Sequence, residues 1–240
     1  MAGSLTYDGP IIMQGSITSP SWTQEFRTNI HLTKGDFKFI NPLENKYKIE
    51  NGARIIVDNG NVVVGDIFGR KYRVEDKEGR VGIYQIQEHR TIISAPNGKI
   101  IAENIVNTVS LDADTIIVLN VEEDSMLFAR EILFYGGKLT FNSTIKLKQG
   151  GLIRFFENFS IQGLSGDAII ELENGKKIRL FDLKTKKIKD LADEYVPEKQ
   201  NYRNDSTMVG NGFTITYEML DDLSKKLTKK KSGWKSKFGF

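Results

Sequence analysis

The chain of 240 residues contains no cysteine and only two histidines. Disulfide bonds and cysteine-ligated zinc sites need thiols, so the composition excludes a disulfide-stabilised scaffold and argues against structural zinc. No apolar run approaches the roughly 18 residues that a membrane-spanning helix needs. The start, MAGSLTYDGP, lacks a basic stretch followed by an apolar one. We therefore expect one or two globular domains with no membrane span and no secretion signal, located in the cytoplasm or in a virion.

Positive charge is concentrated at the C-terminal end. Residues 223–240 contain seven lysines and no acidic residue, whereas residues 1–222 carry a net charge of −4. A cationic end of this kind attracts polyanions or an acidic partner surface, with a strength that falls as the salt concentration rises.

Turn signals separate many short β-type segments. Asn-Gly pairs occur at 51–52, 59–60, 97–98, 174–175 and 211–212, and such pairs favour the tight turns of antiparallel hairpins. The segments between them are rich in Ile, Val, Phe, Tyr and Thr, and several alternate apolar with polar residues. Only five prolines interrupt the chain. The pattern predicts a mainly β protein, with an antiparallel β-sandwich or barrel-like body over residues 1–183 and a possible subdivision near 88–94.

The C-terminal quarter has a different pattern. The apolar spacing of residues 185–196 predicts a short helix that ends before Pro197, and the polar segment that follows predicts a linker, so both lie within 184–215. A second helix is expected from Thr216 to about residue 230, with Thr216 as its N-cap. Asp221–Lys225 and Asp222–Lys226 are i,i+4 pairs of the favoured orientation. Residues 216–240 thus form a C-terminal helix followed by a basic aromatic tail.

Residue patterns typical of catalysis or metal binding are missing. His31 and His89 lie in polar contexts without a metal-binding spacing, and Ser165 sits in a turn-like Gly-Leu-Ser-Gly rather than a nucleophile elbow. The Gly-Lys pairs lack the spacing of a phosphate-binding loop. We therefore expect no catalytic residue, no metal site and no cofactor, and we expect that the protein is not an enzyme.

Acidic residues are plentiful, with Asp112, Asp114 and the cluster at 122–124 lying close together in the sequence. They lack the alternating ligand pattern of a calcium loop, so a solvated acidic loop is the interpretation we favour. A carboxylate pair for sugar hydrolysis stays open, because the fold rather than the sequence sets such a separation.

Aromatic residues cluster at Phe155, Phe156 and Phe159, next to Arg154. Aromatic rings beside a basic side chain can stack on the bases of single-stranded nucleic acid. The alternative, which we prefer, is that these rings belong to the β core and to an interface.

The tail carries the strongest functional signal. Trp234, Phe238 and Phe240 are large aromatic residues near a chain end, where side chains of this size gain nothing by themselves. Three interpretations are open: the tail docks into pockets on another subunit, it folds back onto its own body, or it binds a polyanion. The lysines that would meet an acidic rim or phosphates are Lys229, Lys230, Lys231, Lys235 and Lys237.

Two segments, 125–141 and 159–183, resemble the β-rich mitochondrial-biogenesis family that is related in fold to the tryptophan RNA-binding attenuator protein. Ala129-Arg130 and Tyr135-Gly136 match that family's turn and strand-end motifs, whereas Ile132 stands where the family has a glycine. The resemblance implies a non-catalytic β scaffold that is often oligomeric. It implies no site residues.

These observations favour a non-enzymatic structural or assembly protein, for example a component of a virion or tail machine. Its β body would form interfaces in a homo-oligomer or with other structural subunits, and its tail would act as a docking peptide. The alternative is a nucleic-acid-binding protein that uses the tail. A carbohydrate-binding β protein is a third class, and it would need an exposed aromatic platform beside carboxylates.

Overall fold

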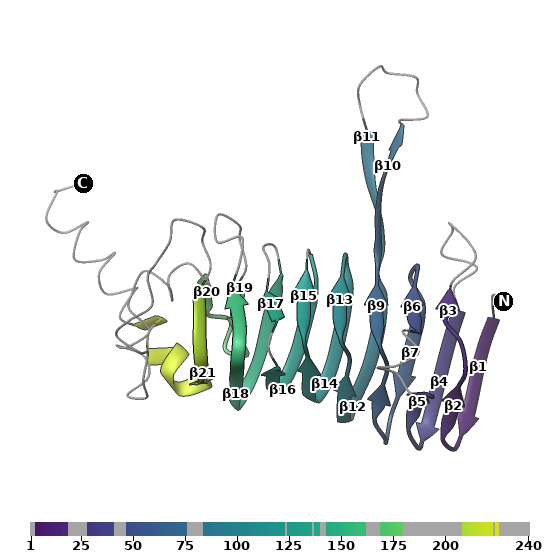
Figure 1. Ribbon diagram of the computed structural model, residues 1–240, viewed down its shortest axis with the longest axis horizontal. Coiled ribbons are helices and arrows are strands. Elements are labelled where there is room, and N and C mark those ends of the chain that lie inside the picture. Colours follow the sequence, from purple (N-terminus) through teal and green to yellow (C-terminus); the bar gives the residue numbers. More distant parts are fainter. Residues whose placement is uncertain are drawn as a thin grey trace, which may run out of the picture.

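The computed structural model describes residues 3–18, 28–40, 47–75, 84–122, 124–135, 137–139, 143–161, 169–179, 208–222 and 224–225. Within these ranges, nineteen strands join in one hydrogen-bonded sheet, and two more form a separate hairpin. The large sheet is wound into a stack of coils, and successive coils lie side by side along the long axis of the molecule (Figure 1).

Each full coil contributes a strand segment to each of three faces. The first face contains β1 (Gly3–Asp8), β4 (Thr28–Lys34), β7 (Arg54–Val57), the first parts of β12 (Thr91–Ile101), β14 (Val109–Val118), β16 (Met126–Phe134) and β18 (Thr144–Ile161), and β19 (Ile169–Leu172). The second contains β2 (Ile11–Met13), β5 (Phe37–Phe39), β8 (Val62–Val63), the later parts of β12, β14, β16 and β18, and β21 (Met208–Thr216). The third contains β3 (Ile17–Thr18), β6 (Lys48–Glu50), β9 (Asp66–Phe68), β13 (Asn104–Val106), β15 (Asn120–Glu122), β17 (Gly137–Leu139) and the end of β18.

Two additions depart from the coil. The antiparallel pair β10 (Arg70–Glu75) and β11 (Tyr84–His89) leaves the stack between the third and first faces and projects away from it (Figure 1). At the C-terminal end, β20 (Lys177–Arg179) forms a hairpin with β19, and a short helix over residues 217–222 and 224–225 follows β21.

The core consists of columns of aliphatic side chains that run along the stack. Parallel register places residues of successive coils directly over one another, so every second residue of a strand points inward and meets its equivalent in the next coil. One column on the first face consists of Ile30, Ile55, Ile93, Leu111, Leu127, Ile145 and Ile170, all buried. The column on the second face consists of Phe37, Val62, Ile100, Ile116, Ile132 and Ile153.

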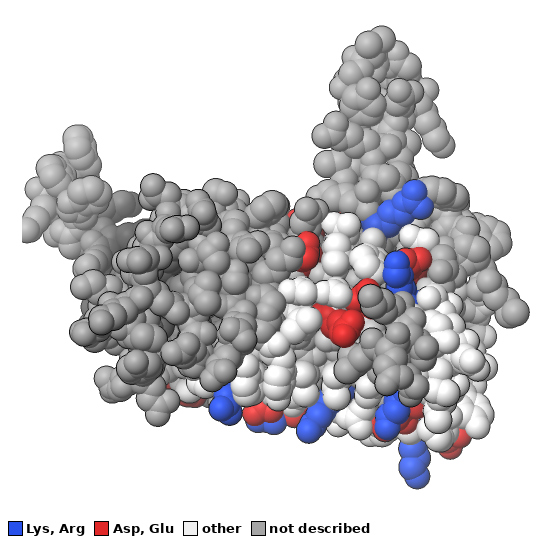
Figure 2. Space-filling view, viewed as in Figure 1, with Lys and Arg blue, Asp and Glu red and all other residues white. Residues whose placement is uncertain are grey.

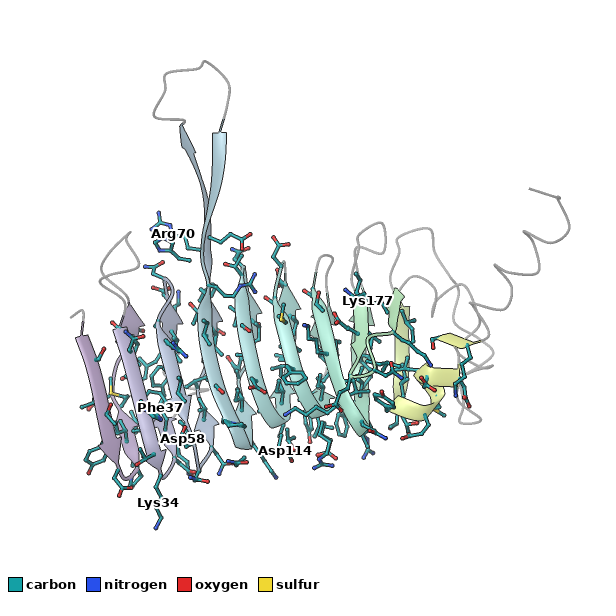
Figure 3. The ribbon with its side chains drawn as sticks, turned by 180° about the vertical axis from the view of Figure 1, so that it is seen from behind. Lys34, Phe37, Asp58, Arg70, Asp114 and Lys177 are labelled. Carbon is teal, nitrogen blue, oxygen red and sulfur yellow. The ribbon has the colours of Figure 1, made fainter. Side chains whose placement is uncertain are left out.

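The corner between the first and second faces depends on glycine. A Cβ atom on Gly60 would collide with the carbonyl oxygen of Gly35, and one on Gly98 would collide with that of Gly60. Polar side chains then connect the coils: the Asn97 side-chain amide donates to the carbonyl of Asp58 (3.0 Å). Lys34 and Asp114 lie along this corner, on the opposite edge from Arg70 at the base of the hairpin (Figure 3).

The mainly β composition predicted from the sequence is confirmed, but the antiparallel arrangement is wrong. Within the described part of the chain, only three strand pairs are antiparallel, β10–β11, β18–β21 and β19–β20. The Asn-Gly pairs at 59–60 and 97–98 suggested hairpins, yet they form coil corners with no left-handed residue at either asparagine. The predicted sandwich or barrel is not confirmed. The coil stack continues across residues 91–95, because β12 pairs with both β7 and β14.

The C-terminal predictions have mixed outcomes. The Thr216 side-chain oxygen accepts a hydrogen bond from the backbone N–H of Met219 (3.3 Å), which confirms the N-cap, and the Asp221–Lys225 ion pair forms at 2.7 Å. Residues 208–212, expected in a linker, instead belong to strand β21. The predicted helix at 185–196 and the pair to Lys226 lie outside the described residues. In the described part of the chain, no helix is long and apolar enough to cross a membrane.

Candidate interaction edge

Strand β1 is the outermost strand of the first face at the N-terminal end of the stack (Figure 1). It pairs in parallel with β4 on one side, and no described strand pairs with its other side. An outermost strand presents unpaired backbone N–H and C=O groups, which can template pairing with a strand from another chain. We call β1, Gly3–Asp8, the open edge.

The open edge also leaves core-type side chains exposed. Leu5 and Tyr7 pair in register with the buried residues Ile30 and Leu32, so they stand in positions that are covered in every later coil. Leu5 is nevertheless 49% exposed and Tyr7 47% exposed. All six residues of β1 are exposed. The column that contains Ile30, and the buried row that contains Leu32, thus end at a surface with nothing over it among the described residues.

The devices by which proteins usually block a sheet edge are nearly absent from β1. Lysine, proline and strong bulges discourage edge pairing. The sequence of β1, GSLTYD, contains no lysine and no proline, and its register irregularity falls at the last step, between Tyr7 and Asp8. Residues 3–7 therefore form a regular and unprotected edge. Exposure is greatest along β1, because Ile11 and Met13 of β2 are half-buried and Ile17 of β3 is buried.

The opposite end of the stack is covered. The strand β21 runs antiparallel along β18, and the helix after it buries Tyr217 and Leu220 against the last coil. The β19–β20 hairpin is tied to this helix, because the Asn174 backbone N–H donates to the Tyr217 hydroxyl (3.3 Å). An antiparallel strand and a helix end the parallel register, so another coil cannot stack here in the same way.

One carboxylate holds the covered end together. Asp221 accepts hydrogen bonds from Lys176 and from the Asn174 side chain (2.8 Å), and it pairs with Lys225 at 2.7 Å. These donors, Lys176 first, hold the pKa of the Asp221 carboxyl well below its usual range, because each one favours the charged form. The carboxylate thus connects the helix to the hairpin.

Two of the acidic residues singled out in the sequence, Asp112 and Asp114, are engaged in ordinary surface ion pairs. Asp114 makes a two-point contact with the Arg130 guanidinium (2.9 Å for each bond), which lowers the pKa of that carboxyl. Asp112 lies 3.7 Å from Lys148. Figure 2 shows basic and acidic side chains next to each other along the lower edge of the described surface. Within the described ranges, no group of three His, Asp or Glu side chains could hold a metal ion.

The remaining sequence candidates are two histidines in the described part of the chain and several residues outside it. His31 hydrogen-bonds to Asp58 (2.8 Å) on the outer surface, and His89 is buried at the end of β11. Ser165 lies outside the described residues, as do the tail residues Trp234, Phe238 and Phe240, with Lys229, Lys230, Lys231, Lys235 and Lys237. Of these candidates the structure describes only the two histidines, which lie on different parts of the fold, strand β4 of the stack and strand β11 of the projecting hairpin.

The Phe155–Phe159 cluster divides between core and surface. Phe155 is buried and stacks on Phe134, with ring centroids 5.1 Å apart. Phe156 points outward, where it stacks on Tyr135 at 4.1 Å while the Arg154 guanidinium lies over its ring. Tyr135 is 51% exposed, so this trio forms a small aromatic surface. The side chain of Phe159 is outside the described set.

Sequence reasoning did not identify the open edge. The sequence of β1, GSLTYD, alternates apolar and polar residues like the strands around it. Nothing in these six residues indicates that the strand is the outermost one of a stack. The usable signal was the absence of lysine and proline at an edge, but that signal has meaning only once β1 is known to be an edge.

Comparisons with known proteins identify no relative: no family model, no curated protein and no solved structure matches the chain. The resemblance of residues 125–183 to the mitochondrial-biogenesis β family accordingly stays a prediction.

Proposed function

We propose that this chain is a non-enzymatic structural protein that assembles through the open edge, with its C-terminal tail as a second docking element. Such a structural protein would suit a virion or a tail machine, as one of its components. The observation that carries the proposal is the exposure of Leu5 and Tyr7, two core-type side chains that lie on an unprotected sheet edge. Exposed apolar side chains beside unpaired backbone groups are the ingredients of β-strand addition.

Light scattering coupled to size-exclusion chromatography tests the assembly proposal on the full chain. The edge-blocked variant Leu5→Lys/Tyr7→Lys places two charges that water can solvate in a free monomer but that an interface would bury unpaired. We expect the wild type to exceed the monomer mass and the variant to return to it. Ile12→Lys is the matched control, since Ile12 is 71% exposed on the same coil but points away from the core. A wild type that stays monomeric at every concentration would contradict the proposal.

The tail is tested in the same experiment by deleting residues 233–240. If the tail is a docking peptide, the truncated protein keeps its fold, as followed by circular dichroism, and loses part of its association. An association that is unchanged by the deletion would remove the tail from the proposal and leave the open edge.

Nucleic-acid binding is a second candidate, and one further observation favours it. The trio of Tyr135, Phe156 and Arg154 presents stacked rings with a guanidinium, which is the combination that stacks on unpaired bases. Binding to a labelled single strand should weaken steeply with salt and should fall when Tyr135→Ala removes the exposed ring. Binding that ignores both salt and Tyr135 would contradict this candidate.

A further inference from the structure

We infer that the partner of the open edge is the open edge of a second copy, and that two chains join head to head about a twofold axis at Thr6. This inference rests on the proposed function and names the partner for that surface. It follows from three features: the difference between the two ends of the stack, the pattern of side chains in β1, and the direction in which the core columns run.

The difference between the ends restricts how copies can join. A head-to-tail contact would put β1 of one chain against the C-terminal end of the next, and repeated contacts of that kind would grow a fibre. The antiparallel strand β21 and the helix that buries Leu220 cover that end. Among the described residues, only the N-terminal end has exposed core-type side chains, so head to head is the end-to-end arrangement that covers them on both chains, and it closes after two copies.

The side-chain pattern of β1 is self-complementary. A twofold axis perpendicular to the stack brings two β1 strands together in antiparallel orientation. With Thr6 on the axis, Thr6 faces Thr6 of the partner subunit, and Leu5 faces the partner's Tyr7. Residues directly opposite in an antiparallel pair point to the same side of the sheet, so the two apolar residues of each strand meet apolar partners. No charged residue lies among these three positions.

The same register joins the two cores. Leu5 continues the column of Ile30, and Tyr7 continues the column of Leu32. In the head-to-head pair, each column passes from one chain into the other, and the exposed sides of Leu5 and Tyr7 are covered on both strands. The association would thus bury surface that later coils of the same stack bury within one chain, which is the origin of its stability.

Cysteine cross-linking tests the register directly, because the natural chain contains no cysteine. In Thr6→Cys, the two sulfurs lie opposite each other across the axis, within the reach of a disulfide. We expect mild oxidation to convert the full-length variant into a covalent species of twice the monomer mass. Ser94→Cys is the matched control, because Ser94 lies at an outward position of the same face but in a central coil, and it should form no covalent dimer.

A second pair of variants fixes the register. Leu5→Cys mixed with Tyr7→Cys should give mixed cross-linked dimers, whereas Leu5→Cys alone should give few, because its own copies lie at diagonal positions too far apart for a disulfide. Equal cross-linking of Leu5→Cys with itself would overturn the Thr6-centred register.

The outcomes separate this inference from the proposed function. A wild-type assembly that needs Leu5 and Tyr7 but contains more than two copies, or that does not cross-link through Thr6→Cys, overturns the head-to-head pair and leaves assembly through the open edge intact. A wild type that is monomeric at every concentration overturns both. A dimer that cross-links through Thr6→Cys and dissociates in Leu5→Lys/Tyr7→Lys supports both.

Discussion

The two ends of this coil stack are built from similar strands but terminate in different ways. At the C-terminal end, an antiparallel strand, a hairpin and a helix cover the last coil, and Leu220 has no exposed surface. At the N-terminal end, Leu5 and Tyr7 occupy equivalent inward positions and are about half exposed. A repeating coil offers the same surface at every level, so each end needs its own solution. One end is closed by the chain itself, and we propose that the other is closed by assembly.

The largest expected effect is the difference in the free energy of unfolding between two leucine variants, one at a buried position of the C-terminal end and one at an exposed position of the N-terminal end. Leu220→Ala removes a fully buried side chain that seals the cap, and it should lower the free energy of unfolding by about 2–5 kcal/mol. Leu5→Ala removes a side chain that already faces water, and it should cost only about 0.5 kcal/mol in dilute protein. Denaturant unfolding monitored by circular dichroism measures both.

The protein concentration sharpens this contrast. If the open edge associates, the cost of Leu5→Ala grows as the concentration rises, because the associated state then contributes to stability. The cost of Leu220→Ala should stay constant. Similar costs for the two variants in dilute protein would mean that the ends do not differ in the way their exposures indicate.

The next effect contrasts two glycines. Gly98 packs so closely against the preceding coil that an added Cβ meets the backbone of Gly60, whereas an added Cβ at Gly3 meets nothing within 4 Å. Gly98→Ala should therefore cost about 1–3 kcal/mol, because backbone at a corner cannot move aside easily. Gly3→Ala should be neutral or slightly stabilising, because it restricts the unfolded chain. Thermal unfolding of the two variants compares them, and an unaffected Gly98→Ala would show that the corner can relax.

What the sequence predicted correctly was local. The N-cap at Thr216 and the ion pair between Asp221 and Lys225 depend on residues three or four positions apart, so spacing alone was enough to predict them. The abundance of strands follows in the same way from the alternation of apolar and polar residues.

The sequence analysis did not predict which strands pair with one another. In the central coils, a strand of the first face pairs with one that lies sixteen to eighteen residues later, as Leu111 does with Leu127 and Leu127 with Ile145. This period is hidden by the insertion of the β10–β11 hairpin and by coils of unequal length. In the turn between β6 and β7, Asn51 and Gly52 do adopt left-handed conformations, as an Asn-Gly turn predicts. The two strands nevertheless belong to different faces and do not pair with each other. There the turn signal was genuine and the pairing inferred from it was wrong, whereas Asn174-Gly175 does join an antiparallel hairpin, β19–β20.

The smallest expected effect tests how the closed end is held. Lys176, Lys225 and Asn174 stabilise the charged form of Asp221 and so lower its pKa in the folded protein. The stability that this gives is fully present above the usual aspartate pKa of about 3.9, and it is lost as the pH falls through the lower folded-state pKa. Asp221→Asn should be less stable than wild type at pH 7, and the difference should shrink as the pH falls toward 2. Asp222→Asn, whose side chain is 68% exposed and pairs with Lys225 alone among the described residues, should show a smaller difference at pH 7. Urea unfolding across this pH range gives both curves. A difference for Asp221→Asn that persists unchanged to pH 2 would mean that this residue holds the cap through packing rather than through charge, and the closed end would then rest on Leu220 and its neighbours.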